Sequence, residues 1–368
     1  MEDRLSRIVA HRRQLHRIPE VNYDLPMTQA YVLDALKKTG ARLEALSPAG
    51  ALAYFDMGKK DTVALRADMD ALPIQECSGL PFASGHPGKM HACGHDAHMA
   101  MLLALAEELS EMSCPRNVLL IFQPAEETGN GARIVLESKA LERYNAREIY
   151  ACHVEPPLPS GTIGCRPGPL MAMSSEVRLQ VKGKSTHIAQ YSEGIDALMA
   201  GLTFLQRSRA HIESVYRDVR HLYGYGRFES GTANNIVAEK AEAWGTLRAY
   251  DEGIFEEMKK DVLSIAKDIS AQSGAKLDLS FGDAYPPVLN DAACFEKLKA
   301  AAGDLPFQVL AQPKNIAEDF ACYLKRLPGA MFLLGLGTPT PLHSSNFIFD
   351  ESALPNGTEM FKRLVMAG

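Results

Sequence analysis

The sequence predicts a two-domain α/β protein, in which a smaller α+β domain is inserted into a larger domain. Strand and helix patterns alternate before residue 175, change to the order β-α-β-β-α-β, and resume after residue 284. The length of 368 residues also exceeds that of one typical domain. We therefore assign residues 1–174 and 285–368 to the larger domain and residues 175–284 to the insert.

Helical and strand patterns alternate in the first part of the chain. Amphipathic helices are predicted at Asp3–Arg17, just before Pro19, and at Met27–Thr39. Four apolar runs predict buried strands, and a helix rich in Ala, Leu and Met lies among them; the strands are 51–55, 62–67, 117–122 and 148–154, and the helix is 96–112. Strands that alternate with helices favour a largely parallel sheet.

The insert has the element order of a split βαβ sandwich of the ferredoxin-like kind. Its predicted elements are a strand at 176–182, a helix at 194–216, strands at 219–229 and 240–250, a helix at 251–272 and a strand at 276–282. Asp251 is a typical cap for the second helix, and Gly274 a typical end. After Pro286, a helix at Phe295–Ala302 and a buried strand at Ala330–Gly335 return the chain to the larger domain.

Composition excludes several classes of function. The chain is 46% hydrophobic and 23% charged, and its formal net charge of -6 gives no reason to expect nucleic acid or an anionic membrane surface as a partner. No run of apolar residues is long enough to span a bilayer, and the charged first twenty residues lack the apolar core of a secretory signal. With an odd number of cysteines, seven, we expect free thiols and a cytoplasmic location.

The segment His91-Ala-Cys-Gly-His-Asp-Ala-His98 is the richest in chemistry, because it offers a thiol, three imidazoles and a carboxylate just before a helix. These groups are the ligands that zinc and similar divalent ions prefer. Cys93 and His95 are two residues apart and can face one point on a loop. The start of a helix is expected to lower the pKa of the Cys93 thiol and favour the thiolate.

Further ligand types follow apolar runs. Asp68, the pair Glu126-Glu127 and His153 each come at the carboxyl end of a predicted strand, and His343 lies a short loop beyond one. That edge of an open α/β sheet is where ligands bind. Because neighbouring side chains diverge, one of the two glutamates can bind a metal while the other acts as a general base.

Several other histidines and cysteines carry no functional prediction. His11, His16, His211 and His221 lie within helix or strand patterns, and Cys152 should point into the core, away from His153; these five are treated as structural residues. His98 lies one helical turn from His95, and we weigh a contact with a metal ligand against a purely structural role.

Eight segments, which run in order along nearly the whole chain, resemble the M20 metallopeptidase family. The similarity is to its branch of bacterial N-acyl-amino-acid amidohydrolases, which includes hippurate hydrolase, auxin-conjugate hydrolases and N-acetyldiaminopimelate deacetylase. The segments are Arg12–Glu20, Leu65–Pro73, Met90–Asp96, Phe122–Glu127, His153, Gly245–Arg248, Glu318–Phe320 and Leu342–His343.

The resemblance implies a zinc-exopeptidase-like catalytic domain, a ferredoxin-like lid that dimerises, and two divalent metal ions per chain. Cys93 would bridge both ions. One ion would also bind Glu127 and His343, and the other His95 and His153. Zinc is the default, and manganese, cobalt and nickel suit such a mixed ligand set as well.

The resemblance also implies catalytic and substrate-binding residues. Glu126 would be the general base that activates a metal-bridging water, and Asp68 would orient a metal ligand. In the lid, His187 of Lys184-Ser-Thr-His would stabilise the oxyanion, while Arg248 and Asn235 would bind the substrate carboxylate. The implied reaction is hydrolysis of the amide bond of a small N-acyl amino acid.

The sequence departs from the branch around His187, where it reads Ser-Thr-His-Ile-Ala and the branch usually has a run like Gly-Gly-His-Ala-Ala. It departs also in Thr128, where Gly is usual, and in Glu155, a carboxylate where an apolar residue is expected. We hypothesise that Glu155 favours a polar or cationic substrate end. Within the family, a dipeptidase, a carboxypeptidase or an N-acetyldiaminopimelate deacetylase are the alternatives. Outside it, a thiol enzyme based on Cys93 and a non-catalytic binding protein on the same scaffold remain open.

Overall fold

The computed structural model of the protein describes residues 2–127 and 130–368, so that Thr128 lies outside the described residues. The chain forms two compact units. The larger comprises Met1–Leu170, Val288–Pro313 and Asp319–Gly368, and the smaller comprises Met171–Pro287 and Lys314–Glu318. Each unit has its own cluster of buried apolar side chains.

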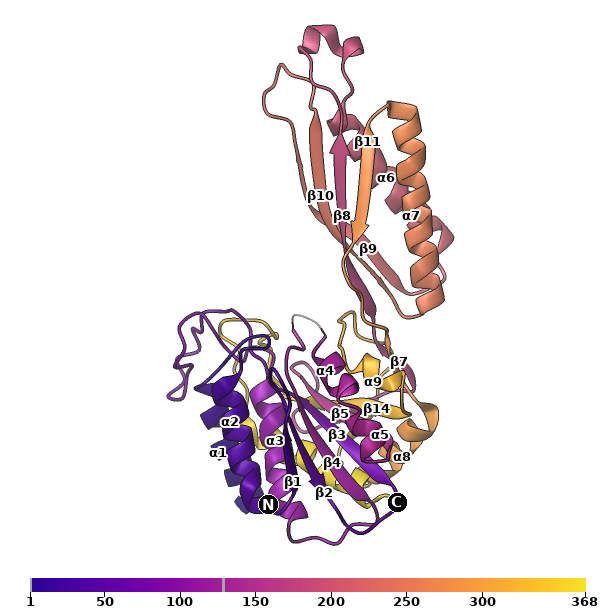
Figure 1. The fold of residues 1–368 in the computed structure, drawn as a ribbon. Helices are drawn as coiled ribbons and strands as arrows, with labels where there is room; N and C mark the ends of the chain where they lie inside the picture. The colour runs from indigo at the N-terminus through magenta and orange to yellow at the C-terminus, as the bar shows by residue number, and fades with distance from the viewer. Residues whose placement is uncertain (1, 128–129) are drawn as a thin grey trace. The chain divides into compact units, whose positions relative to one another are not determined.

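A mixed sheet forms the centre of the larger unit (Figure 1). In the described part of the chain its order is β1-β2-β4-β3-β5-β14-β6-β13. The strands are β1 Arg42–Ala45, β2 Ala51–Phe55, β3 Thr62–Asp68, β4 Asn117–Gln123, β5 Ala146–Glu155, β6 Ile163–Cys165, β13 Phe307–Val309 and β14 Gly329–Gly335. The central strands β4, β3, β5 and β14 run parallel, whereas β1 and β2 pair antiparallel with their neighbours. Strand β6 pairs antiparallel with β14 and parallel with β13. Every residue of β3, β4 and β14 is buried, as the continuous apolar runs predict.

Helices cover both faces of this sheet (Figure 1). They are α1 Glu2–His16, α2 Pro26–Leu36, α3 His95–Leu109, α4 Gly131–Glu137, α5 Ala140–Arg143, α8 Ala292–Ala302, α9 Ala321–Leu324 and α10 Leu354–Met366. The helix α3 is buried along almost its whole length, and both α1 and α10 pack against it. Its Ala-, Leu- and Met-rich sequence therefore faces protein on nearly every side.

The smaller unit is a four-stranded antiparallel sheet with two helices on one face (Figure 1). Its elements are β8 Met173–Lys182, α6 Ala197–Val215, β9 His221–Ser230, β10 Lys240–Ala249, α7 Glu252–Ser273 and β11 Lys276–Phe281. Their order along the chain is β-α-β-β-α-β, so the ferredoxin-like prediction for the insert is confirmed. The Asp251 carboxylate accepts a hydrogen bond from the Ile254 N–H at the start of α7, and Gly274 ends the helix at φ +74°.

A short two-stranded ladder lies where the chain passes between the units. It consists of β7 (Gly168–Met171) and β12 (Val288–Asn290), which pair with each other. At the carboxyl edge of the main sheet, Asp68 pairs in register with Gln123, and His153 pairs with Leu333 of β14. This edge gathers the predicted ligand types. No helix in the described ranges is long and apolar enough to cross a membrane.

Candidate metal centre

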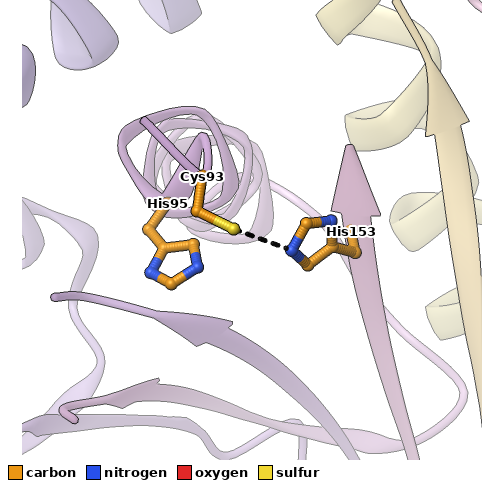
Figure 2. A group of neighbouring side chains, drawn as sticks. All are labelled: Cys93, His95 and His153. Carbon is orange, nitrogen blue, oxygen red and sulfur yellow. Dashed lines mark hydrogen bonds between the residues drawn. The ribbon is translucent and has the colours of Figure 1, made fainter. Parts of the chain in front are cut away.

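Cys93, His95 and His153 meet at the carboxyl edge of the sheet (Figure 2). Cys93 lies in the turn before α3, His95 begins that helix, and His153 is near the end of β5. The Cys93 sulfur is 3.5 Å from His153 Nε2, and one ligand atom from each residue lies within 4.8 Å of the others. Gly94 permits this approach: its φ is +85°, and a Cβ there would lie 2.6 Å from Val154 Cγ2.

A second group of ligand types shares Cys93 with the first. It adds Glu127 and His343, and His343 Nε2 is 3.4 Å from the Cys93 sulfur and 3.4 Å from Glu127 Oε1. The two groups differ in exposure. His95 and His153 are buried, whereas the His343 side chain is 53% exposed and its backbone has φ +63°. The structure therefore brings together all five residues that were predicted as metal ligands.

The donor atoms fit divalent cations. In both buried histidines Nδ1 donates to a backbone carbonyl, at 2.7 Å to Asp70 for His95 and at 2.7 Å to Val154 for His153. These bonds leave Nε2 of each ring for a metal ion. His95 Nε2 is buried with no hydrogen-bond partner among the described residues. A thiol, imidazoles and a carboxylate around such an orphaned nitrogen suit zinc or a similar ion.

Electrostatics at the centre favour positive charge. Burial opposes protonation of His95, but Asp68, Asp70 and Glu127 outweigh burial and raise its pKa to about 10. For Cys93 the predicted lowering of the thiol pKa is wrong. Burial, together with Glu127 and Glu126, raises its thiol pKa well above the usual value. A metal ion bound here would displace protons from the centre, so the strength of its binding would depend on pH.

Asp70, which sequence reasoning did not single out, holds the two glutamates in place. One of its carboxylate oxygens accepts from the Glu126 N–H at 2.9 Å, and the other accepts from the Glu127 N–H at 3.1 Å. Its backbone carbonyl also accepts from His95 Nδ1. Asp70 is 1% exposed. The only signal in the sequence was a second carboxylate two residues after Asp68, just beyond the end of the same strand.

Asp68 and His98 form a buried pair beside the first ligand group. His98 Nδ1 donates to Asp68 at 2.6 Å, and His98 Nε2 accepts from the Val154 N–H at 2.9 Å, which makes the ring neutral. Burial, more than any other influence, lowers the His98 pKa to about 4. Arg66 donates to Asp68 at 2.7 Å, and Asp68 lies 3.6 Å from His95 Nε2. His98 thus links Asp68 to the strand that carries His153.

The remaining predicted site residues lie in the smaller unit, at opposite ends of β10. The segment of His187 pairs with that of Asn235, because the Ile188 N–H donates to the Asn235 carbonyl at 2.9 Å. Arg248 lies near the other end of the strand, opposite Ser174, where it donates to the Asn315 carbonyl. From Lys240 to Arg248 the strand advances eight residues at about 3.3 Å each, or about 26 Å.

Comparison with known proteins identifies relatives along nearly the whole chain. The sequence model of peptidase family M20/M25/M40 matches residues 64–367. An N-acetyldiaminopimelate deacetylase of Enterococcus faecalis is 36% identical over 363 residues, which cover 96% of this chain and 95% of that protein. One from Exiguobacterium sibiricum is 34% identical over 94% of each chain. A solved structure of a Bacillus subtilis dinuclear metal-binding M20 peptidase has a TM-score of 0.86 at 31% identity and covers 100% of this chain and 98% of that chain.

Proposed function

Because this chain belongs to peptidase family M20/M25/M40, whose members hydrolyse amides, we propose that it uses two divalent metal ions to remove the acyl group from N-acyl amino acids. The observation that carries the proposal is the pair of ligand groups that share Cys93. The Bacillus subtilis relative is described as dinuclear, which supports two ions here.

We propose that one ion takes Cys93, His95 and His153, and the other takes Cys93, Glu127 and His343. Both sets have their ligand atoms within 4.8 Å of one another. Ions held by these residues would lower the pKa of a nearby water towards neutrality and would polarise the amide carbonyl. Zinc suits the thiolate and imidazole ligands, and manganese, cobalt and nickel are further candidates.

The protein's own residues perform the proton transfers in this proposal. Glu126, which lies within 4.8 Å of ligand atoms of His95 and Glu127, takes the proton from the attacking water and passes it to the leaving amine. Asp70 holds the Glu126 backbone during both transfers. Asp68 keeps His95 and His98 in place through their shared contact.

His187 is the proposed donor to the oxyanion, and the loss of one such donor typically costs about 3 kcal/mol of transition-state stabilisation. Arg248 is the proposed partner of the substrate's α-carboxylate, which a guanidinium binds in bidentate fashion, and Asn235 assists. Because His187 and Arg248 lie near opposite ends of a ten-residue strand, one small substrate does not reach both within one chain. This separation supports a homodimer in which each chain supplies His187 to its partner's site.

Surface features of the smaller unit support such a dimer. The strand β9 is at the edge of its sheet, where its backbone groups can pair with a second strand. The first two turns of α6 expose three large apolar side chains, which are Leu198, Met199 and Leu202. A second copy that extends the sheet and covers these side chains would bury both features.

N-acetyldiaminopimelate is the specific substrate that the relatives' names and one residue favour. The relatives from Enterococcus faecalis and Exiguobacterium sibiricum are both named for that deacetylation. Glu155 is two residues after His153 on β5, so its side chain leaves the same face of the strand, and it is 7% exposed. A carboxylate there would favour a substrate with a distal ammonium group. Dipeptides and peptides with a free carboxyl terminus are the alternative substrates.

The Glu155 proposal is tested with a matched pair of substrates, N-acetyllysine and N-acetylnorleucine, which differ at the end of the side chain. Wild type is expected to prefer N-acetyllysine in kcat/KM, and Glu155→Leu should reverse or abolish that preference. Unchanged selectivity in the variant would refute a role for Glu155.

We place the protein in the cytoplasm, where a reducing environment keeps Cys93 available as a ligand. Its seven cysteines, all within the described residues, form no disulfide. Air oxidation in the absence of reductant is expected to lower metal content.

The experiment that tests the function combines metal analysis with a panel of N-acetyl, N-benzoyl and dipeptide substrates, with and without chelator. About two ions per chain and chelator-sensitive deacylation are expected. Glu126→Gln should keep the ions and lose at least about 100-fold in kcat. Glu137→Gln, an exposed carboxylate on α4, is the matched control and should match wild type. Metal without turnover would favour a binding protein, and activity that survives chelation would favour a thiol enzyme.

A further inference from the structure

A surface loop, residues 73–89, lies in the connection between β3 and α3. Hydrogen bonds link it to the segments that carry His95 and His343, one residue from each ligand group of the candidate metal centre. Two backbone hydrogen bonds of 3.0 Å between Leu72 and Met90 close the loop at its base. In the loop, Glu76 is nearly buried, with a side chain only 3% exposed. Glu76 and the next residue, Cys77, connect the loop to the segments that carry His95 and His343.

Glu76 connects the loop to the first turn of α3. One of its carboxylate oxygens accepts from His16 Nε2 at 3.2 Å, and the other accepts from the Ser84 N–H at 2.7 Å. The opposite nitrogen of the His16 ring, Nδ1, donates to Asp96 at 2.8 Å. Since both ring nitrogens face carboxylates, both carry hydrogen and the ring is a buried cation. Asp96 directly follows His95 in the chain, so these hydrogen bonds link the loop to the residue next to a proposed metal ligand.

Cys77 connects the same loop to the segment that carries His343. Its backbone N–H donates to the Ser345 carbonyl at 2.8 Å, two residues after His343. The His343 N–H donates to the Ala92 carbonyl at 2.9 Å. The His343 side chain is 53% exposed and its φ of +63° is uncommon for a residue other than glycine. The position of His343 therefore depends on these backbone contacts more than on packing.

We propose that Glu76 is a positioning residue for the metal centre, because it fixes the 73–89 loop between the His16–Asp96 pair and the His343 segment. The inference rests on the proposed function, since it requires that ions bind. The glutamine of Glu76→Gln keeps one oxygen, so either His16 Nε2 or the Ser84 N–H would face an NH2 group instead of an acceptor. The attachment of the loop to His16 and the charge that holds the ring protonated would both weaken. The His343 segment would then move more freely, and the ion shared by Glu127 and His343 would dissociate faster.

The test measures dissociation of the ions from zinc-loaded protein into an excess of a chromophoric chelator, independently of catalysis. Wild type is expected to release two ions, and His343→Ala should lack one of the two release phases, which identifies it. Glu76→Gln should accelerate that same phase by about tenfold or more, the size typical for partners of metal ligands. The other phase should change less, because His95 and His153 are buried.

Glu108→Gln is the matched control. Glu108 also links α1 to α3, through Arg4 at 2.6 Å, and its side chain is 11% exposed. It lies twelve residues along α3 from Asp96, or about 18 Å from the metal end. Thermal unfolding of the metal-free variants should show a loss of stability in both, whereas only Glu76→Gln should change ion release.

His16→Gln is a second route to the same test, in case Glu76→Gln folds poorly. It should also accelerate the phase that His343→Ala removes, and the double variant should release that ion no faster than the faster single variant. Effects that multiply, equal acceleration in Glu108→Gln, or a wild-type rate in Glu76→Gln would each overturn the role of Glu76. Failure of wild type to bind any ion would instead overturn the proposed function.

Discussion

Replacement of Asp70 by asparagine tests whether one carboxylate positions both the proposed base and a proposed ligand. In the wild type its two oxygens accept from the N–H groups of Glu126 and Glu127. The asparagine amide keeps one oxygen and places an NH2 group against the other N–H. The carbonyl of residue 70, which accepts from His95 Nδ1, belongs to the backbone and remains.

The expected loss follows from the number of backbone groups left without a partner. A buried N–H without an acceptor costs about 1–3 kcal/mol, so Asp70→Asn should lower the free energy of unfolding by about that amount. Asp70→Ala leaves both N–H groups unpaired and should cost about twice as much. A displacement of Glu126 by as little as 1 Å can reduce kcat by about 100-fold.

Three measurements on wild type and the two variants test whether Asp70 positions Glu126 and Glu127. They are urea unfolding of the metal-free protein, metal content, and kcat on the best substrate of the panel. The order of stability should be wild type, asparagine, alanine, and kcat should fall more steeply than metal content because His95 keeps its hydrogen bond. Equal stability of all three proteins, or a normal kcat in Asp70→Asn, would refute this reasoning.

Three further predictions concern the surroundings of the centre. Gly94→Ala should lower the free energy of unfolding by about 2–5 kcal/mol in urea titrations, because its Cβ would lie 2.6 Å from Val154 at φ +85°; a normal midpoint would contradict this. His98→Ala leaves the Val154 N–H without its acceptor, and competition titration should show metal affinity reduced by about 10- to 100-fold. Burial lowers the His16 pKa, but Asp96 and Glu76 raise it more, from 6.5 to about 9. The protonated ring therefore stabilises the metal-free fold fully below pH 6.5, and about 3 kcal/mol is lost as the pH rises to about 9. His16→Gln should abolish this slope in unfolding measurements across that range, and a slope equal to that of wild type would exclude His16 as its origin.

The fold was predictable where local patterns are strong. Continuous apolar runs predicted β3, β4 and β14, and the β-α-β-β-α-β order predicted the architecture of the smaller unit. Strands of three or four residues, such as β1, β6 and β13, are too short to show a period and were not predicted. Helix α10 was not predicted either, although Pro355 in its first turn is a typical signal for the start of a helix.

The candidate site was predictable to the extent that its residues occur at strand ends. Cys93, His95, Glu127 and His153 belong to segments whose position in an α/β sheet brings them to one edge. The supporting residues are different, because a carboxylate such as Asp70 or Glu76 becomes informative only when its partners are known. Glu76 does accept from the nearby Ser78 hydroxyl, but its partners Ser84 and His16 lie eight and 60 residues away, and no local pattern predicts these two contacts.

The pairing of β7 with β12 has a consequence for how the chain folds. The residues between Leu170 and Val288 number 117 (171 to 287), and closing a flexible loop of that length would cost about 4 kcal/mol of chain entropy. An insert that has already folded holds its own ends at a limited distance and removes much of that cost. The order of folding most favourable for the larger unit is therefore one in which the residues synthesised in the middle of the chain acquire their structure first, and the two halves of the enclosing sheet join afterwards.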